Sequence, residues 1–480
     1  MDQQTSQMKK SSATYLGLII LLISVPIAVS AVLTLLFGEF EYFHAFAIPA
    51  VTASAIGCLL YFPTRTENLS PLNLRQAMSV VVAGWVFAFF ISAWPFSLGG
   101  LVSYRLALFE SVSGWTTTGL SVLTEAELPQ IYLLWRSLMQ FLGGAGFAIA
   151  MLSSIIGPIG AGLSKAEGRQ EVLPMVKQSA ATIGLIYVSY TILAAIGFRI
   201  FGMSWFDAVN HSMATLSTGG FSTRGASIGF WANPRLEVFT IAVMVLANFN
   251  FVTHHNLLRR RWRSAAENPE LRVLAVGFAV ALGAVIAAPV VSVAGESRTY
   301  IFQIISALTT TGFSTVDLST EWAGAPLLIL VILMCIGGGV NSTSGGIKQR
   351  RIYILFKSIT WQIREHLLPS RAVVSHTISD HGLIEEVSDS EIRQVGNFVF
   401  LYLFTLAAAT VMISAYGYSI SDSLFEAASS VGTVGLSVGI TGPQAPAGVL
   451  WIQKACMFLG RLEFFAIIVA LRRWLQSVNL

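Results

Sequence analysis

Apolar runs long enough to cross a bilayer as helices alternate with short polar loops along most of the chain. The first two runs extend from Tyr15 to Phe37 and from Phe43 to Phe62. A signal peptide would have a shorter apolar core followed by a small-residue cleavage site, so the first run is expected to stay in the protein. We therefore predict a transmembrane hairpin within residues 1–76.

Beyond this hairpin the chain repeats one unit four times: a span, a shorter apolar segment, and a second span. We call the units repeats 1 to 4, residues 77–165, 166–263, 264–370 and 371–480. Their expected spans are 77–96 and 131–156, 183–201 and 236–252, 271–294 and 326–356, and 395–416 and 449–474. The pattern predicts an all-α membrane protein with ten spanning helices and four re-entrant pore helices, its four pseudo-symmetric span–pore-loop–span repeats surrounding one central pore.

Each short segment ends in threonine, any residue, glycine, a large apolar residue and serine, at residues 117–121, 218–222, 310–314 and 433–437. One copy alone is typical of a helix end with a glycine cap. Four aligned copies favour pore loops, because non-helical backbone at membrane depth must line water or be buried in protein. Their carbonyls would replace the hydration shell of a small cation. The expected filter residues are Thr117, Thr118, Gly119, Leu120, Thr218, Gly219, Gly220, Phe221, Thr310, Thr311, Gly312, Phe313, Thr433, Val434, Gly435 and Leu436.

A polar residue also recurs at one position of each short segment. Ten residues before the motif glycines stand Phe109, Asn210, Phe302 and Phe425, followed by Glu110, His211, Gln303 and Glu426. We expect these four polar side chains to tie each filter loop to its pore helix, not to bind the ion directly.

Composition supports the membrane assignment. The chain has 480 residues, of which 54% are hydrophobic and 11% charged, whereas roughly a quarter of the residues of a soluble protein are charged. The net charge of +4 does not predict a nucleic-acid partner, because the basic residues lie between spans. Cys58, Cys335 and Cys456 lie far apart within apolar runs, which predicts neither a disulfide framework nor a metal site.

Basic residues gather in the loops on one side of the expected topology, which marks the cytoplasmic face. Both termini are therefore expected inside, with the four short segments entering from outside. The residues are Lys9, Lys10, Arg65, Arg75, Lys165, Arg169, Lys177, Arg259, Arg260, Arg261, Arg263, Arg272, Lys348, Arg350, Arg351, Lys357, Arg364, Arg371, Arg393, Arg472 and Arg473.

Residues 337–348 and Arg461 interrupt the apolar pattern. The glycine-rich stretch would break a helix in mid-span, and a small-residue packing surface, the alternative, normally needs a GxxxG spacing. We expect a short movable loop that obstructs the conduit. Arg461 faces either the pore, where it would lower cation occupancy, or a glutamate in a structural ion pair. The expected gate residues are Gly337, Gly338, Gly339, Asn341, Ser342, Thr343, Ser344, Gly345, Gly346, Lys348 and Arg461.

These motifs resemble those of the TrkH/KtrB/HKT superfamily of potassium uptake proteins. The resemblance rests on the four filter motifs, on residues 216–223 and 337–348, and on Gly460–Glu463, which resembles the segment with the family's pore-facing arginine. It covers the chain from about residue 77 onward. The additional N-terminal hairpin resembles TrkH more than the shorter KtrB.

The resemblance implies potassium-selective uptake across a bacterial cytoplasmic (inner) membrane, with potassium as the transported ion, because glycine is present in all four motifs. The residue between the threonine and the glycine differs among the four motifs, so strict fourfold symmetry of the filter is not expected. The residues at this position are Thr118, Gly219, Thr311 and Val434. The resemblance also implies a homodimer and a cytoplasmic ring of nucleotide-binding RCK subunits of the TrkA or KtrA type. Residues 259–263 and 362–393, with acidic Glu385, Glu386, Asp389 and Glu391, are candidate contacts, although the basic run equally suits an anchor at anionic membrane lipid.

Two other mechanisms stay open. A sodium- or proton-coupled potassium symporter would shift its reversal potential with the second ion. An intramembrane enzyme would need paired catalytic groups in mid-span, but His254 and His255 lie at a helix end, so we do not expect an enzyme. The sequence contains neither a P-loop motif nor a dinucleotide-binding motif, so we do not expect a nucleotide site on this chain.

Overall fold

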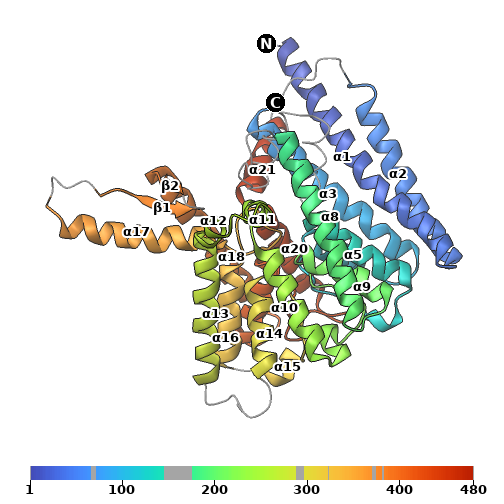
Figure 1. Cartoon of the computed structure of the whole chain (residues 1–480). Helices are drawn as coiled ribbons and strands as arrows, with labels where there is room; N and C mark the ends of the chain where they lie inside the picture. The colour runs from blue at the N-terminus through green and yellow to red at the C-terminus, as the bar shows by residue number, and fades with distance from the viewer. Residues whose placement is uncertain are drawn as a thin grey trace.

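The computed structural model describes residues 2–65, 72–144, 176–287, 297–322, 324–369, 374–380 and 383–478. Helices make up nearly all of this part of the chain (Figure 1). The start of α1 (Asp2–Leu36) and the end of α21 (Phe465–Val478) lie at the same end of the molecule (Figure 1). Several predicted features lie outside the described residues: 145–156 and 288–294 of two spans, and the basic residues Lys165, Arg169 and Arg371.

The N-terminal hairpin consists of α1 and α2 (Phe43–Tyr61), joined through a 3-10 turn, η1 (Phe40–Tyr42). The two helices approach closely at Gly17, where a Cβ atom would lie 2.8 Å from the main-chain nitrogen of Tyr61. Small residues permit such close packing of membrane helices. The hairpin runs along one side of the molecule, beside α3 (Leu74–Leu98) (Figure 1).

The rest of the chain contains four helix triplets. The first helices are α3, α8 (Val176–Ile200), α13 (Pro269–Ala287) and α18 (Asp389–Ser414). The middle helices are α4 (Tyr104–Trp115), α9 (Trp205–Leu216), α14 (Ser297–Leu308) and α19 (Ile420–Val431). The third helices are α5 (Gln130–Gly144), α10 (Pro234–Asn248), α16 (Ala325–Ile336) and α20 (Ala447–Arg461). Short helical turns, η2 (Glu125–Glu127), η4 (Ser227–Trp231) and α15 (Leu318–Glu321), lie between middle and third helices.

The middle helices are too short to cross a membrane. Each has 12 residues, which is about 18 Å at ~1.5 Å per residue, against roughly 30 Å of bilayer hydrocarbon. Local sequence explains where two of them begin, because the Oγ atoms of Ser204 and Ser419 accept hydrogen bonds from the main-chain nitrogens of Asp207 and Asp422 at 3.0 and 3.1 Å. Each middle helix ends just before its Thr-x-Gly motif.

The third helices of repeats 2, 3 and 4 are interrupted. The chain bends by 109° between α10 and α11 (Phe251–Leu258), where the Oδ1 atom of Asn250 caps the new helix by accepting from Thr253 N at 2.7 Å. Residues 337–348 separate α16 from α17 (Gln349–Leu367), as predicted. Glu463 and Phe464 adopt positive φ angles of 55° and 56° between α20 and α21. The segments expected to span at 236–252 and 449–474 are therefore each broken and do not form one continuous helix.

By length and composition, six of the described helices could each cross a bilayer, and the bent pair of α10 and α11 could be a seventh. They are α1, the segment Phe40–Tyr61 that includes α2, α3, α8, α13 and α18. The ten predicted spans are thus found only in part within the described ranges, because the breaks divide several of them into shorter helices.

A two-stranded antiparallel sheet, β1 (Thr377–Asp380) and β2 (Leu383–Glu386), departs from the all-α prediction. It projects with α17 from the body of the molecule (Figure 1). Ile378 packs in a small cluster with Trp361, which gives the hairpin its own apolar anchor. Arg350 pairs with Glu385 at 2.8 Å and with Glu391 at 3.3 Å, so two of the predicted partner-contacting acids are engaged within the chain.

Candidate ion pathway

The four Thr-x-Gly segments, residues 117–121, 218–222, 310–314 and 433–437, share one backbone conformation. Each first threonine has a left-handed φ angle, which β-branched residues adopt rarely: 55° at Thr117, 50° at Thr218, 55° at Thr310 and 49° at Thr433. Each motif glycine also has a positive φ angle: 92° at Gly119, 75° at Gly220, 83° at Gly312 and 99° at Gly435. Unusual backbone geometry that recurs at four equivalent places indicates a shared functional constraint.

The segments contact one another in cyclic order. A Cβ atom on Gly119 would collide with the carbonyl oxygen of Gly219 in the next repeat. Each other motif glycine abuts a carbonyl oxygen in the same way: Gly220 that of Thr311, Gly312 that of Val434, and Gly435 that of Thr118. Repeat 4 thus returns to repeat 1, and the four predicted filter segments form one closed ring. Only glycine allows the neighbouring main chains to approach this closely.

A cavity of about 630 Å³ opens onto the ring. All four motif glycines line it, together with Phe221, Leu436 and the motif serines Ser222, Ser314 and Ser437. The cavity is large enough to hold many water molecules. Charged side chains of both signs also line it, namely Glu125, Arg136, Arg224 and Asp317. A hydrated cation could therefore reach the ring through this cavity.

Oxygen atoms are the groups that the ring offers to a ligand. The Oγ1 atoms of Thr117 and Thr433 are buried and have no hydrogen-bond partner among the described residues. The Thr218 hydroxyl donates to the carbonyl oxygen of Ser217 at 2.7 Å, and Thr310 Oγ1 accepts from Gly345 N at 2.7 Å. Hydroxyl and carbonyl oxygens at close quarters suit a dehydrated monovalent cation.

The recurring polar residues of the middle helices all reach the serine of their own motif. Glu110 lies 3.1 Å from Ser121 Oγ, His211 lies 2.9 Å from Ser222 Oγ, and Gln303 lies 2.9 Å from Ser314 Oγ. Glu426 makes the same contact with Ser437. Polar side chains of three kinds, Glu, His and Gln, therefore make one equivalent contact between helix and loop in all four repeats.

Two residues that the sequence analysis missed support the glutamates. Arg136 Nε donates to Glu110 at 2.6 Å, and Gln453 Nε2 donates to Glu426 at 3.0 Å. Arg136 and Gln453 are both the seventh residue of a third helix, α5 and α20. Their polarity within an apolar run was the available signal.

The glycine-rich loop, residues 337–348, lies against the ring. Thr343 Oγ1 donates to the carbonyl oxygen of Leu216 at 2.9 Å, and the Gly345 amide donates to Thr310 as described above. A Cβ atom on Gly345 would collide with the carbonyl oxygen of Gly432, just before the fourth segment. The predicted gate residues are thus next to the predicted filter residues of repeats 3 and 4.

A buried carboxylate that the sequence analysis missed holds the other side of this loop. Glu270, from the first turn of α13, accepts from Val340 N at 2.7 Å and from Asn250 Nδ2 at 2.7 Å. Asn268 Nδ2 lies 3.3 Å from the same carboxylate. Glu270 therefore joins the loop to the bend between α10 and α11.

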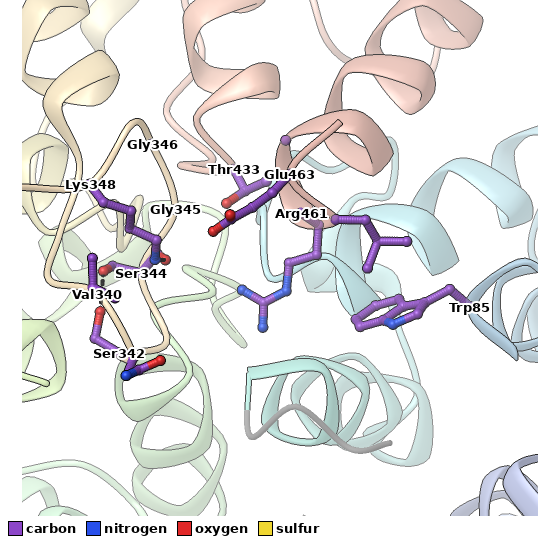
Figure 2. Close-up of a pocket in the computed structure, with 13 residues that line it drawn as sticks. Trp85, Val340, Ser342, Ser344, Gly345, Gly346, Lys348, Thr433, Arg461 and Glu463 are labelled. Atoms are coloured by element: carbon purple, nitrogen blue, oxygen red, sulfur yellow. Dashed lines mark hydrogen bonds between the residues drawn. The ribbon is translucent and has the colours of Figure 1, made fainter. Parts of the chain in front are cut away.

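Arg461 lies between the glycine-rich loop and Trp85, beside a small cavity of about 40 Å³ (Figure 2). Its guanidinium donates to the carbonyl oxygen of Thr343 at 3.1 Å and to that of Gly143 at the end of α5. The described contacts of Arg461 are thus with main-chain carbonyls of the loop and of repeat 1. The neighbouring Glu463 pairs instead with Arg351.

Comparison with known proteins agrees with this arrangement. The TrkH family model, described as a cation transport protein, matches residues 43–269 and 280–480. The Trk system potassium uptake protein TrkH of Escherichia coli strain K12 is 30% identical to this chain, and the match covers 94% of this chain and 96% of TrkH. An uncharacterized cation transporter of Methanocaldococcus jannaschii is 30% identical over 95% of this chain and 93% of that protein.

The crystal structure of the potassium transporter TrkH from Vibrio parahaemolyticus has the same fold, with a TM-score of 0.81 at 25% identity, over 96% of this chain and 98% of that one. The resemblance inferred from the motifs is confirmed. The matched proteins are transporters and not enzymes. The chain is an integral membrane protein and belongs to the TrkH family of cation transport proteins.

Proposed function

We propose that this chain takes up potassium across the membrane through a channel-like pore at the ring of four Thr-x-Gly segments. The observation that carries this proposal is the cyclic contact of the four motif glycines with the neighbouring carbonyl oxygens. Such a ring supplies oxygen ligands from all sides to one axis, where they replace the hydration shell of the ion. The names of the related potassium uptake proteins support potassium as the cation.

The glycine-rich loop and Arg461 form the proposed gate below this filter. The loop is held to the ring at Thr310 and to the Leu216 carbonyl, and Arg461 holds it through Thr343. A fixed positive charge on the pathway also disfavours a cation beside it, most strongly where the effective dielectric is low. Opening therefore requires these hydrogen bonds to be exchanged.

Regulation is proposed to come from a cytoplasmic partner, a ring of nucleotide-binding subunits. The chain is proposed to work as a homodimer in a bacterial inner membrane, with both termini in the cytoplasm. The projecting α17 and its β-hairpin offer a contact surface away from the helical body (Figure 1). The basic residues of the loops support the orientation, because such loops stay on the cytoplasmic side.

The test is ion flux into liposomes that contain the purified protein without partner subunits, at several imposed potentials. Gly312→Ser should weaken potassium flux or admit sodium, because the new side chain meets the Val434 carbonyl. Gly283→Ser is the matched control, since a Cβ atom there meets nothing within 4 Å. A flux that needs a sodium or proton gradient would replace the pore with a coupled symporter, and equal behaviour of the two variants would place the ion path elsewhere.

A further inference from the structure

One buried amide side chain of repeat 1 holds the proposed filter segment of repeat 2. Gln140, on α5 of repeat 1, is 0% exposed. Its Nε2 donates to the carbonyl oxygen of Gly219, and its Oε1 accepts from the main-chain nitrogen of Phe221 at 3.1 Å. Both groups belong to the second segment, on either side of Gly220. The two ends of one amide thus hold the backbone that flanks a motif glycine.

This contact has no counterpart at the other boundaries of the ring. Gln140 is the eleventh residue of α5, and the eleventh residues of α10 and α20 are Met244 and Met457. The eleventh residue of α16 is Cys335, whose thiol is only a weak donor. Within the described ranges, no side-chain donor reaches the carbonyls of Thr118, Thr311 or Val434, which are equivalent to Gly219.

The same contact explains why repeat 2 carries two consecutive glycines. A Cβ atom on Gly219 would collide with the side-chain amide of Gln140. The corresponding residues of the other motifs, Thr118, Thr311 and Val434, all carry side chains. Gly219 is not among the glycines with a positive φ angle, so the space that the Gln140 amide occupies, and not backbone strain, favours glycine here.

We propose that Gln140 is a positioning residue that sets the ion selectivity of the ring. The inference rests on the proposed pore function. By fixing the Gly219 carbonyl and the Phe221 amide, Gln140 prevents the second segment from rotating toward a smaller ion. Selectivity depends on the number and placement of such oxygens. Serines of their own repeats hold the other three segments, at Gly119 N, Phe313 O and Gly435 N, whereas Gln140 fixes a carbonyl of the second segment from a neighbouring repeat.

The first test is Gln140→Met, which nearly conserves the volume and removes both hydrogen bonds. Reversal potentials with potassium on one side and sodium on the other should show a potassium-to-sodium permeability ratio lowered roughly two- to tenfold, the range that the net value of one hydrogen bond represents. Met457→Leu, at the equivalent position of α20, should leave the ratio unchanged. Gln140→Leu, which also has neither a donor nor an acceptor, should lower it as well and serves if the first variant does not fold.

The second test separates positioning from general packing. Gly219→Ala should lower potassium flux because the methyl group meets Gln140, and Gln140→Ala in the same protein should restore part of it. A rescue of this kind shows direct coupling of the two positions. Additive losses in the double variant would overturn the inference.

Measurement of Gly312→Ser in the same liposomes distinguishes a failure of the inference about Gln140 from a failure of the proposed pore. If Gly312→Ser changes the permeability ratio while Gln140→Met and Gln140→Leu leave it intact, the inference about Gln140 fails and the pore stands. If none of the three changes it, the proposed filter itself fails.

Discussion

The Nε atom of Arg136 lies 2.6 Å from the Oε1 atom of Glu110, and the two side chains are 1% and 0% exposed. The guanidinium also reaches the Ser121 hydroxyl at 3.0 Å and lies 4.1 Å from the centre of the Phe221 ring. One arginine therefore contacts the first and the second Thr-x-Gly segment. It is the charged counterpart of Gln453 in repeat 4.

Arg136→Gln should strongly destabilise the protein, because it leaves the Glu110 carboxylate buried without its cation. Breaking a buried ion pair on one side destabilises proteins by about 3–5 kcal/mol. Thermal unfolding in detergent measures the effect. Arg235→Gln, at an exposed residue, is the control and should change little. Equal unfolding temperatures for the two variants would show that the pair contributes little to the fold.

Glu270→Gln should raise basal potassium flux in the absence of a partner. The new amide group would face a donor, either Val340 N or Asn250 Nδ2, and so loosen the glycine-rich loop. The net free energy of one hydrogen bond to a charged group corresponds to a change of about tenfold or more in an equilibrium constant, here that between the held and the released loop. Flux into liposomes is the measurement, with the exposed Glu267→Gln as control. A decrease would mean that Glu270 holds the conducting form of the loop.

Arg461→Met should raise potassium flux severalfold. The substitution removes a positive charge beside the proposed pathway and the hydrogen bonds to Thr343 and Gly143. Arg472→Met, in the exposed part of α21, removes the same charge away from the loop and should leave flux unchanged. Current through planar bilayers checks this, and unchanged current in Arg461→Met would leave the arginine a structural link only.

Glu39→Ala should loosen the N-terminal hairpin from repeat 1. The two carboxylate oxygens of Glu39 accept hydrogen bonds from Gln130 N at 2.8 Å and from Ile131 N at 3.0 Å, and thereby cap α5. Loss of a helix cap destabilises by about 1 kcal/mol. Unfolding in detergent, or protease cleavage between hairpin and repeat, reports the change. Glu41→Ala removes a nearby exposed carboxylate and should behave as the parent protein.

The sequence by itself determined the features that depend on local pattern. Apolar runs and repeated motifs specified the N-terminal hairpin, the short middle helices and the loop between α16 and α17. A helix or a turn at these places needs only neighbouring residues of the right kind, such as Ser204 ahead of α9 or consecutive glycines after Ile336. The recurring polar residue of each middle helix could also be found by aligning the repeats, because it contacts a serine of its own repeat, as Glu110 and Glu426 do.

Only the tertiary structure decided which repeats contact one another and which distant side chains hold the filter segments and the glycine-rich loop. Gln140 meets a carbonyl 79 residues away, and Arg461 meets one 318 residues away, so no local pattern announces either contact. The breaks after α10 and α20 were missed, because isolated polar residues such as Asn250 and Glu463 do not by themselves determine where a helix bends. The β-hairpin was hidden because its short strands gain their place by packing Ile378 against α17. In each case the deciding energy comes from burying groups against partners that are distant in the chain, and folding alone brings those partners together.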